Sequence, residues 1–467
     1  MSESATAPIV LISAVGLTPR LLPHAPRLAT LGRDGWSRPV VDSVPAVTCT
    51  AQATLLSGRL PRDHGIVGNG WLFRDTQEVR FWQQSRTLVQ SDLLEEVARS
   101  RARERGRPFR VAKLFWWYNQ GADVDVSITP KPLYGADGSK VFGIWGAPPE
   151  LPPRLESSLG SFPFPSFWGP MAGSPATRWI ARCAAEVLAS ERPDLSLVYL
   201  PHLDYDPQRF GPSGCDMPRL VGELDEAAAP LLDAAKAAGA QVWVFGEYGH
   251  CDVDRAILPN RALREAGLLS VRPGRFGDQL EAFQSRAFAV SDHQLAHVYV
   301  RREDDIARVR DEIAALPGVD RVAVGDERAK LGLDHPRSGE VVALAEPDAW
   351  FAYPFWLDEA QAPDYARTVD IHRKPGYDPC ELFFDPKLAN PKLRAMRRLA
   401  QKKLGFRTLM DLISLDPSLV KGSHGRPADR DEDRPLLIGH GPAPTSPGAL
   451  PMTSVRDLLL DALGVRD

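Results

Sequence analysis

Residues 44–71 read VPAVTCTAQATLLSGRLPRDHGIVGNGW, and the rest of the chain is best interpreted around this stretch. A proline-bounded turn leads to three small polar residues, Thr48, Cys49 and Thr50, which precede a helical run at 51–56. The N–H groups of a first helical turn have no partner inside the helix, so they can hold an anion. A hydroxyl at this position could attack phosphorus if a base or a metal ion lowers its pKa. Alternatively, Thr48 or Thr50 simply caps the helix.

Length and composition limit the class of protein. The 467 residues suffice for one large α/β domain with an insertion, or for two domains. A net charge of -4 gives no reason to expect a nucleic-acid or anionic-membrane partner. Five scattered cysteines without a C-x-x-C pair and an N-terminus unlike a signal peptide favour the cytoplasm. No run of about 18 apolar residues occurs, so we expect no membrane span.

Short apolar runs alternate with amphipathic segments in the first half of the chain. We expect strands at 9–14, 109–117, 195–200 and 241–245, and helices at 91–103, 175–189 and 218–238. This alternation predicts an α/β fold with a doubly wound, mostly parallel sheet and helices on both faces. In such a sheet, sites form at the carboxyl ends of strands. The turn at Thr48 and the loops after residues 200 and 245 all lie at such ends.

The alternation of apolar runs and amphipathic segments ends near residue 258, where a small α+β insertion is expected. We divide the chain into a first core part, 1–257, a cap or insertion, 258–365, and a completing core part, 366–467. Residues 119–173 are rich in Pro, Gly and aromatic residues and are expected to form long loops. The basic segment 392–403 is interpreted as a solvated helix face rather than a nucleic-acid surface, because the whole chain is acidic.

The order of residues in 44–71 resembles the nucleophile motif of the alkaline phosphatase superfamily. The similarity is greatest to the type I phosphodiesterase/nucleotide pyrophosphatase and phosphonoacetate hydrolase group, where a Thr is followed by T/S-G, P-x-x-H-G-I and Asn. The corresponding residues here are Thr48, Ser57-Gly58, 61–66 and Asn69. The resemblance implies that Thr48 forms a covalent phospho-Thr intermediate. It also implies that Asn69, with N–H groups near Cys49, stabilises the phosphoryl charge.

Members of this group hold two divalent ions, usually zinc, so the resemblance also implies four ligand-bearing segments. Two segments keep a ligand, Asp204 and His424, and a third has Glu247 where the motif has Asp. The motif's Asp, His and His are replaced by Val15, Gln208 and Tyr248. With fewer imidazoles and more oxygen ligands, such a site would favour Mn or Mg over Zn.

Other residues could replace the missing ligands. The candidates are His202, Asp206, His250 and His372, whereas Asp292, His293 and His297 are interpreted as structural or as supporting the site. We therefore predict one or two divalent ions, Zn or Mn, with Asp204, Glu247, His424, His372 and His202 as ligands.

The leading functional prediction is a metal-dependent hydrolase of a phosphodiester, pyrophosphate or phosphonate. The alternative is a catalytically degenerate member that acts as a binding or scaffold protein, for example in a biosynthetic pathway. Val15, Gln208 and Tyr248 favour this alternative, whereas the intact stretch from Thr48 to Asn69 argues against it. A phosphomutase is less favoured, because such enzymes usually use Ser. The predicted partner is a small phosphorylated or phosphonate substrate. In this superfamily the loops and the cap determine which substrate is accepted.

Overall fold

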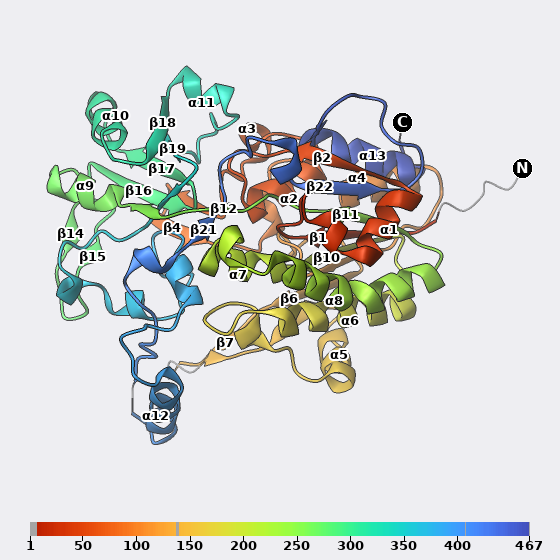
Figure 1. Cartoon of the computed structure of the whole chain (residues 1–467), viewed down its shortest axis with the longest axis horizontal. Helices are drawn as coiled ribbons and strands as arrows, with labels where there is room; N and C mark the ends of the chain where they lie inside the picture. Colours follow the sequence, from red (N-terminus) through yellow and green to blue (C-terminus); the bar gives the residue numbers. More distant parts are fainter. Residues whose placement is uncertain (1–6, 137–139, 407, 467) are drawn as a thin grey trace, which may run out of the picture.

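The computed structural model describes residues 7–136, 140–406 and 408–466. Its centre is a nine-stranded sheet with the order β23-β2-β22-β11-β1-β10-β5-β6-β9 (Figure 1). The strands are β1 (Ile9–Ala14), β2 (Trp36–Val41), β5 (Val111–Leu114), β6 (Val126–Pro130), β9 (Ile144–Ala147), β10 (Leu195–Leu200), β11 (Gln241–Phe245), β22 (Leu436–Gly439) and β23 (Leu450–Pro451).

The middle of this sheet is parallel. β1 pairs in parallel with β10 and β11, and β5 pairs in parallel with β10 and β6. β22 is antiparallel to both β11 and β2, so β2 runs in the same direction as β11. The carboxyl ends of β1, β2, β10 and β11 therefore lie at one edge of the sheet. The predicted mostly parallel α/β sheet is confirmed.

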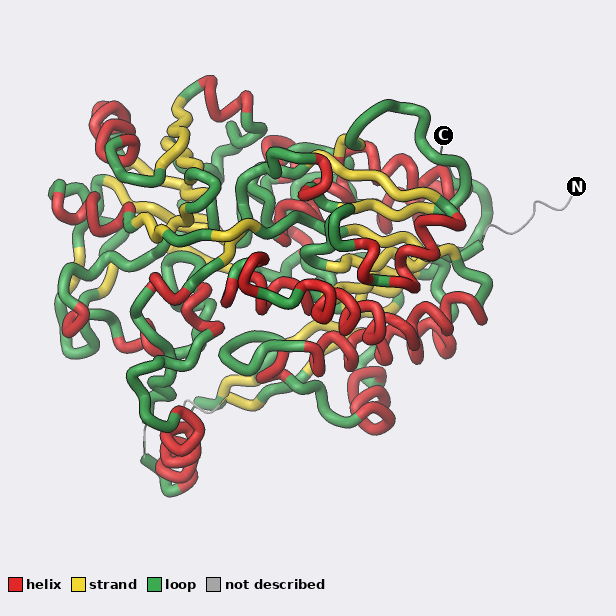
Figure 2. Tube along the Cα trace, in the orientation of Figure 1, coloured by secondary structure: helices red, strands yellow, loops and turns green. Residues whose placement is uncertain are grey.

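Helices cover both faces of the sheet, as Figure 2 shows. Along β1, Ile9 and Leu11 belong to one buried apolar cluster, whereas Val10 and Ile12 belong to another, as expected for a strand buried on both sides. The first cluster includes α2 (Thr48–Ser57), α4 (Leu94–Glu104) and α13 (Val455–Ala462). The second includes α1 (Pro26–Asp34), α6 (Ser174–Glu191) and α8 (Met217–Ala237).

A second, antiparallel sheet with the order β16-β17-β19-β18 lies within residues 258–365. Its strands are β16 (Ala287–Asp292), β17 (Leu295–Val300), β18 (Val319–Val324) and β19 (Val341–Ala345), accompanied by α9 (Pro259–Glu265), α10 (Ile306–Ala314) and α11 (Asp326–Lys330). Figure 1 shows this part at the left, away from the nine-stranded sheet. An α+β unit is thus present, while the division of the chain at 257 and 365 stays a prediction.

Residues 119–173 correct the expectation of long loops. They contain β6, β9, the two-stranded hairpin β7 (Leu133–Tyr134) and β8 (Lys140–Val141), and α5 (Leu151–Leu159). Val126 and Ile128 are buried because β6 adds to the parallel sheet, with β9 at its edge. The prolines hid this pattern because they lie at element ends, such as Pro130 of β6 and the start of α5.

Shorter elements complete the structure. They are α3 (Pro61–His64), β3 (Gly70–Phe73), β4 (Glu78–Phe81), α7 (Tyr205–Phe210), β12 (Cys251–Asp252), β13 (Arg255–Ile257), β14 (Val271–Arg272), β15 (Gln279–Leu280), β20 (Ala349–Phe351), α12 (Pro391–Lys403) and β21 (Gly422–Ser423). None of the helices in the described ranges is both long enough and apolar enough to pass through a membrane.

Candidate active site

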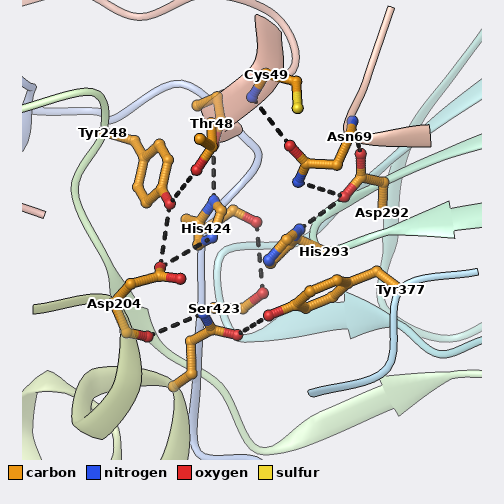
Figure 3. A network of polar contacts seen from close by, with 12 residues as sticks. Thr48, Cys49, Asn69, Asp204, Tyr248, Asp292, His293, Tyr377, Ser423 and His424 are labelled. Carbon is orange, nitrogen blue, oxygen red and sulfur yellow. Dashed lines mark hydrogen bonds and ion pairs between the residues drawn. The ribbon is translucent and has the colours of Figure 1, made fainter. Parts of the chain in front are cut away.

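Thr48 is the first residue of α2, which follows the carboxyl end of β2. The N-cap is Val47, with extended φ and ψ of -133° and 155°, and no side chain caps the helix. Thr48 is only 2% exposed, and its Oγ1 lies 2.9 Å from the Tyr248 hydroxyl (Figure 3). The Thr50 Oγ1 donates to the carbonyl of Ile66 instead. The capping alternative therefore does not hold for either threonine.

Asn69 lies beside the start of α2 and is held there by Asp292 at the end of β16. The Asn69 backbone N–H and Nδ2 donate to the two Asp292 carboxyl oxygens at 2.6 and 3.1 Å. Asn69 Oδ1 accepts the Cys49 N–H at 3.0 Å. The Cys49 N–H is thus already used, whereas the second Nδ2 hydrogen of Asn69 is available to another acceptor.

Three potential metal ligands meet at the carboxyl edge of the sheet. Ligand atoms of Asp204, His250 and His424 lie within 4.8 Å of one another. Among the described residues, this is the one group of three or more His, Cys, Asp or Glu side chains placed closely enough to hold a metal ion. Asp204 follows β10 and His250 follows β11. The pairing of β12 with β21 brings His424 next to them. The Nε2 atoms of His250 and His424 are 3.2 and 3.6 Å from Asp204 Oδ1.

Tyr248 connects this cluster to Thr48. Its hydroxyl donates to Asp204 Oδ1 at 3.1 Å and also contacts Thr48 Oγ1. Its ring stacks on His424 with centroids 3.8 Å apart and planes 8° apart. The residue that stands where the motif has a histidine ligand is therefore a structural link between the candidate nucleophile and the candidate metal ligands.

The cluster of Asp204, His250 and His424 fits a divalent ion. Bonds of about 2.0–2.2 Å in a tetrahedral site separate ligand atoms by about 3.3–3.6 Å, close to the 3.2 and 3.6 Å that separate the two Nε2 atoms from Asp204 Oδ1. His424 Nδ1 contacts the Ala46 carbonyl at 2.8 Å, while the buried Nε2 has no hydrogen-bond partner in the described ranges. Burial lowers the pKa of His424 well below its usual value. Burial raises the pKa of Asp204, but the hydrogen bond to His250 and the nearby imidazoles outweigh it and lower this pKa to about 2.

The residues around Glu247 form an incomplete second ligand set. Val15 is fully buried and offers only methyl groups. Glu247 Oε1 accepts hydrogen bonds from the Ser13 hydroxyl and, at 2.7 Å, from Gln52 Nε2. Burial raises the pKa of Glu247 to about 8, despite these hydrogen bonds. The other carboxyl oxygen, Oε2, is buried and has no hydrogen-bond partner among the described residues, so Glu247 keeps one oxygen that could face an ion.

We expect Glu247→Gln to change how stability depends on pH. The pKa of Glu247 is about 8 in the folded chain against 4.5 in the unfolded one. The contribution of the protonated Glu247 carboxyl to the free energy of unfolding is present in full below pH 4.5. It is lost progressively as pH rises and is gone above about 8. Gln keeps the acceptor oxygen and cannot ionise, so the variant should gain on the order of a few kcal/mol relative to wild type between these limits.

The measurement is the Tm of metal-free wild type and Glu247→Gln from pH 5 to 9. Glu312→Gln, at a partly exposed position of α10 beside Arg308, is the matched control and should follow the wild type. Parallel curves for wild type and Glu247→Gln would contradict the raised pKa.

Two residues predicted as ligands lie elsewhere. His202 Nε2 is 3.2 Å from a carboxyl oxygen of Glu223 on α8. His202 and Asp204 share a short 3-10 turn, in which side chains two residues apart point about 120° apart. His372 Nδ1 contacts the Phe81 carbonyl at 3.2 Å. Asp206, also considered, pairs with Arg209 at 2.7 Å.

The hairpin between β16 and β17 contributes more to the site than the sequence indicates. His293, at its tip, stacks on Tyr377 and packs at a tilt of 36° against His424, with ring centroids 3.8 Å apart in both pairs. The Tyr377 hydroxyl donates to Gln208 Oε1 at 2.7 Å. Tyr248, His424, His293 and Tyr377 thus form a continuous stack of rings. Tyr377 gave no signal in the sequence.

Two further features support a specialised site. Gln52 donates a hydrogen bond to Glu247. Its place in the site could have been inferred from the sequence, because it lies one helical turn after Thr48 on the same face of α2. Glu247 and His293 have φ angles of 64° and 61°, a left-handed conformation that non-glycine residues seldom adopt and that clusters at functional sites.

A cavity of about 560 Å³ borders the metal-ligand cluster through His250. Its wall carries charges of both signs, from Arg20, Arg426, Arg430, Asp252, Asp429 and Asp433. A small polar or anionic molecule in this cavity would therefore meet the cluster at His250.

Comparison with known proteins shows the family and the fold of this chain. The sequence model of the type I phosphodiesterase / nucleotide pyrophosphatase family matches residues 9–378. The chain belongs to this family. It is thus a member of the alkaline phosphatase superfamily, and the match covers the Thr48 stretch, both loops after β10 and β11, and the antiparallel sheet. No curated protein matches the sequence.

Solved structures show the same fold at low sequence identity. Phosphonoacetate hydrolase from Sinorhizobium meliloti 1021, in complex with phosphonoformate, superposes with a TM-score of 0.62 and 15% identity, covering 98% of this chain and 96% of that one. Murine ectonucleotide pyrophosphatase / phosphodiesterase 5 gives a TM-score of 0.58 and 14% identity, covering 98% and 95%. The human protein of that name gives 0.57 and 13%, with the same coverage.

Proposed function

We propose that this family member hydrolyses a phosphodiester, pyrophosphate or phosphonate, with Thr48 as the nucleophile. Asp204, His250 and His424 would hold one divalent ion, Zn or Mn. The observation that carries the proposal is the Tyr248 hydroxyl, which contacts both Thr48 Oγ1 and Asp204 Oδ1. The candidate nucleophile and the candidate metal ligands are therefore only two hydrogen bonds apart.

The hydrogen bonds place the protons for attack. Tyr248 donates its one hydroxyl hydrogen to Asp204, and Thr48 Oγ1 also lies within hydrogen-bond reach of Glu247, so the Thr48 hydrogen can be donated to Tyr248 or to Glu247. This leaves the lone pairs of Thr48 Oγ1 free to attack phosphorus. The free Nδ2 hydrogen of Asn69 is available to a phosphoryl oxygen. A bound divalent ion would supply positive charge against the charge that develops on phosphoryl oxygens.

The reaction would then proceed in two displacements. Thr48 Oγ1 forms a bond to phosphorus, the bond from phosphorus to the leaving group breaks, the Thr48 hydroxyl proton ends on the leaving group, and a phospho-Thr results. Water then attacks phosphorus and releases Thr48 with its hydroxyl restored.

One observation favours a second candidate, a binding or scaffold protein without catalysis. Thr48 is nearly inaccessible, and the second ligand set is replaced by Val15, Tyr248 and a hydrogen-bonded Glu247. In this case the ring stack and the cluster would be structural remnants of a catalytic site.

Metal binding and hydrolysis by the purified protein separate the two candidates. Titration of metal-free protein with Mn or Zn should give about one equivalent per chain, and bis(p-nitrophenyl) phosphate should be cleaved only with the ion present. Absence of both binding and hydrolysis would overturn the enzyme proposal and leave the binding protein. Two equivalents with independent affinities would overturn the assignment of one ion.

A further inference from the structure

Helix α12 presents apolar side chains to solvent. Leu393, Met396 and Leu399 are 58%, 59% and 55% exposed. They follow the helical spacing that normally faces a protein core. Figure 1 shows α12 projecting from the body of the molecule at its lower edge. The apolar face of this helix is thus turned away from the protein.

The opposite face of α12 fixes this orientation. Arg394 and Arg398 both bind the carboxylate of Asp411, and Arg398 Nε lies 2.9 Å from its Oδ1. Ala395 packs against the small apolar cluster that includes Leu412 and Ile413. Two arginines therefore face the protein while three large apolar residues face solvent, the reverse of an ordinary surface helix.

The exposed face is also strongly basic. Residues 391–406 contain six Lys or Arg residues and no Asp or Glu, although the whole chain has a net charge of -4. Four of these cations are exposed and form no ion pair with any described residue. They are Lys392, Arg397, Lys402 and Lys403.

Apolar exposure continues beyond the helix. Leu404 and Phe406 follow α12 directly and are exposed. In Figure 1 the β7–β8 hairpin lies at the same lower-left end of the molecule. Exposed residues of the hairpin and the segment after it are Leu133, Tyr134, Val141, Phe142 and Trp145. Lys140 Nζ lies 5.5 Å from the ring centres of both Tyr134 and Phe142, so cations accompany apolar groups here too.

We propose that the exposed face of α12 docks this protein onto an anionic lipid bilayer. The apolar side chains would enter the boundary between headgroups and acyl chains, and the four free cations would lie against lipid phosphates. A second copy of the chain is disfavoured, because a symmetric contact would oppose these cations to one another. A nucleic acid would leave the apolar face uncovered. This inference is independent of catalysis at Thr48.

Vesicle co-flotation tests the proposal with the full chain. Wild type should float with vesicles of phosphatidylcholine containing about one third phosphatidylglycerol, should stay in solution with phosphatidylcholine alone, and should release as ionic strength rises. The triple variant L393S/M396S/L399S and the charge variant K392Q/R397Q/K402Q/K403Q should each lose binding by at least about tenfold. Because all seven side chains are exposed, far-UV circular dichroism and Tm should remain those of wild type.

The matched control is L60S/F276S, which removes exposed apolar groups elsewhere and should bind vesicles as wild type does. Equal binding to neutral and anionic vesicles, or no binding to either, would overturn the proposal. A dimer seen by light scattering that dissociates in L393S/M396S/L399S would instead assign the surface to a second copy of the chain. Hydrolysis of a soluble aryl phosphodiester should be unchanged in both helix variants, so failure of lipid binding and failure of catalysis are told apart.

Discussion

Thr48→Ala should lower the turnover of an aryl phosphodiester by at least about a thousandfold, because it removes the atom that bonds to phosphorus. The remaining contacts of the site are retained, since Asn69 is held by Asp292 and Cys49 and does not depend on the Thr48 side chain. The substrate KM should therefore change far less than kcat. The measurement is steady-state hydrolysis with saturating metal ion.

Thr48→Ser is the matched control, because it keeps a hydroxyl within reach of Tyr248 and should retain measurable turnover. An unchanged rate in Thr48→Ala would move the nucleophile to a neighbour, and the structure argues against both. Thr50 Oγ1 is directed at the Ile66 carbonyl. Burial raises the pKa of Cys49 well above its usual value, so its thiol is not ionised at neutral pH. Acid-stable phosphate on wild type but not on Thr48→Ala would identify the intermediate directly.

Asp204→Asn should weaken binding of Mn or Zn by at least about a hundredfold and abolish metal-dependent hydrolysis. Asp204 is the anionic member of the cluster, and its Oδ1 is the common partner of His250, His424 and Tyr248. The amide keeps the shape of the side chain but removes the charge that a hard divalent ion requires. Isothermal titration of the metal-free protein measures the affinity without reference to activity.

His202→Asn is the control for this experiment. His202 is two residues from Asp204 in sequence, but it contacts Glu223 rather than the cluster. Its replacement should leave metal affinity within about twofold of wild type, while His424→Asn should lower it. Equal losses in His202→Asn and Asp204→Asn would show that the cluster is misassigned.

The fold was predictable from the sequence because its signals are local. β1 is a continuous apolar run, and the crossover helices are amphipathic, so a doubly wound, mostly parallel sheet follows from general rules of α/β folds. The turn at Thr48 was found for the same reason. The expectation of long loops in residues 119–173 was wrong. Prolines and aromatic residues obscured the sequence pattern of β6 and of the edge strand β9.

The ligand set was less predictable because it depends on side-chain directions in loops. His202 and His250 are equally close to expected ligands along the chain, yet the 3-10 turn directs His202 to α8, while the β12–β21 pairing brings His250 and His424 together. Tyr248 was interpreted only as a lost ligand. That its hydroxyl joins Thr48 to Asp204 follows from three-dimensional distances alone.

The replacement of two ligands has an evolutionary consequence. Val15 is fully buried in the same apolar cluster as Leu203 and Tyr248, so an Asp placed there alone would bury an unpaired charge at a cost of several kcal/mol. A histidine at 248 alone would remove the hydroxyl that joins Thr48 to Asp204. Each single reversion is therefore worse than the present residue. A two-ion site would therefore require both changes together, because the arrangement around Tyr248 tolerates neither change alone.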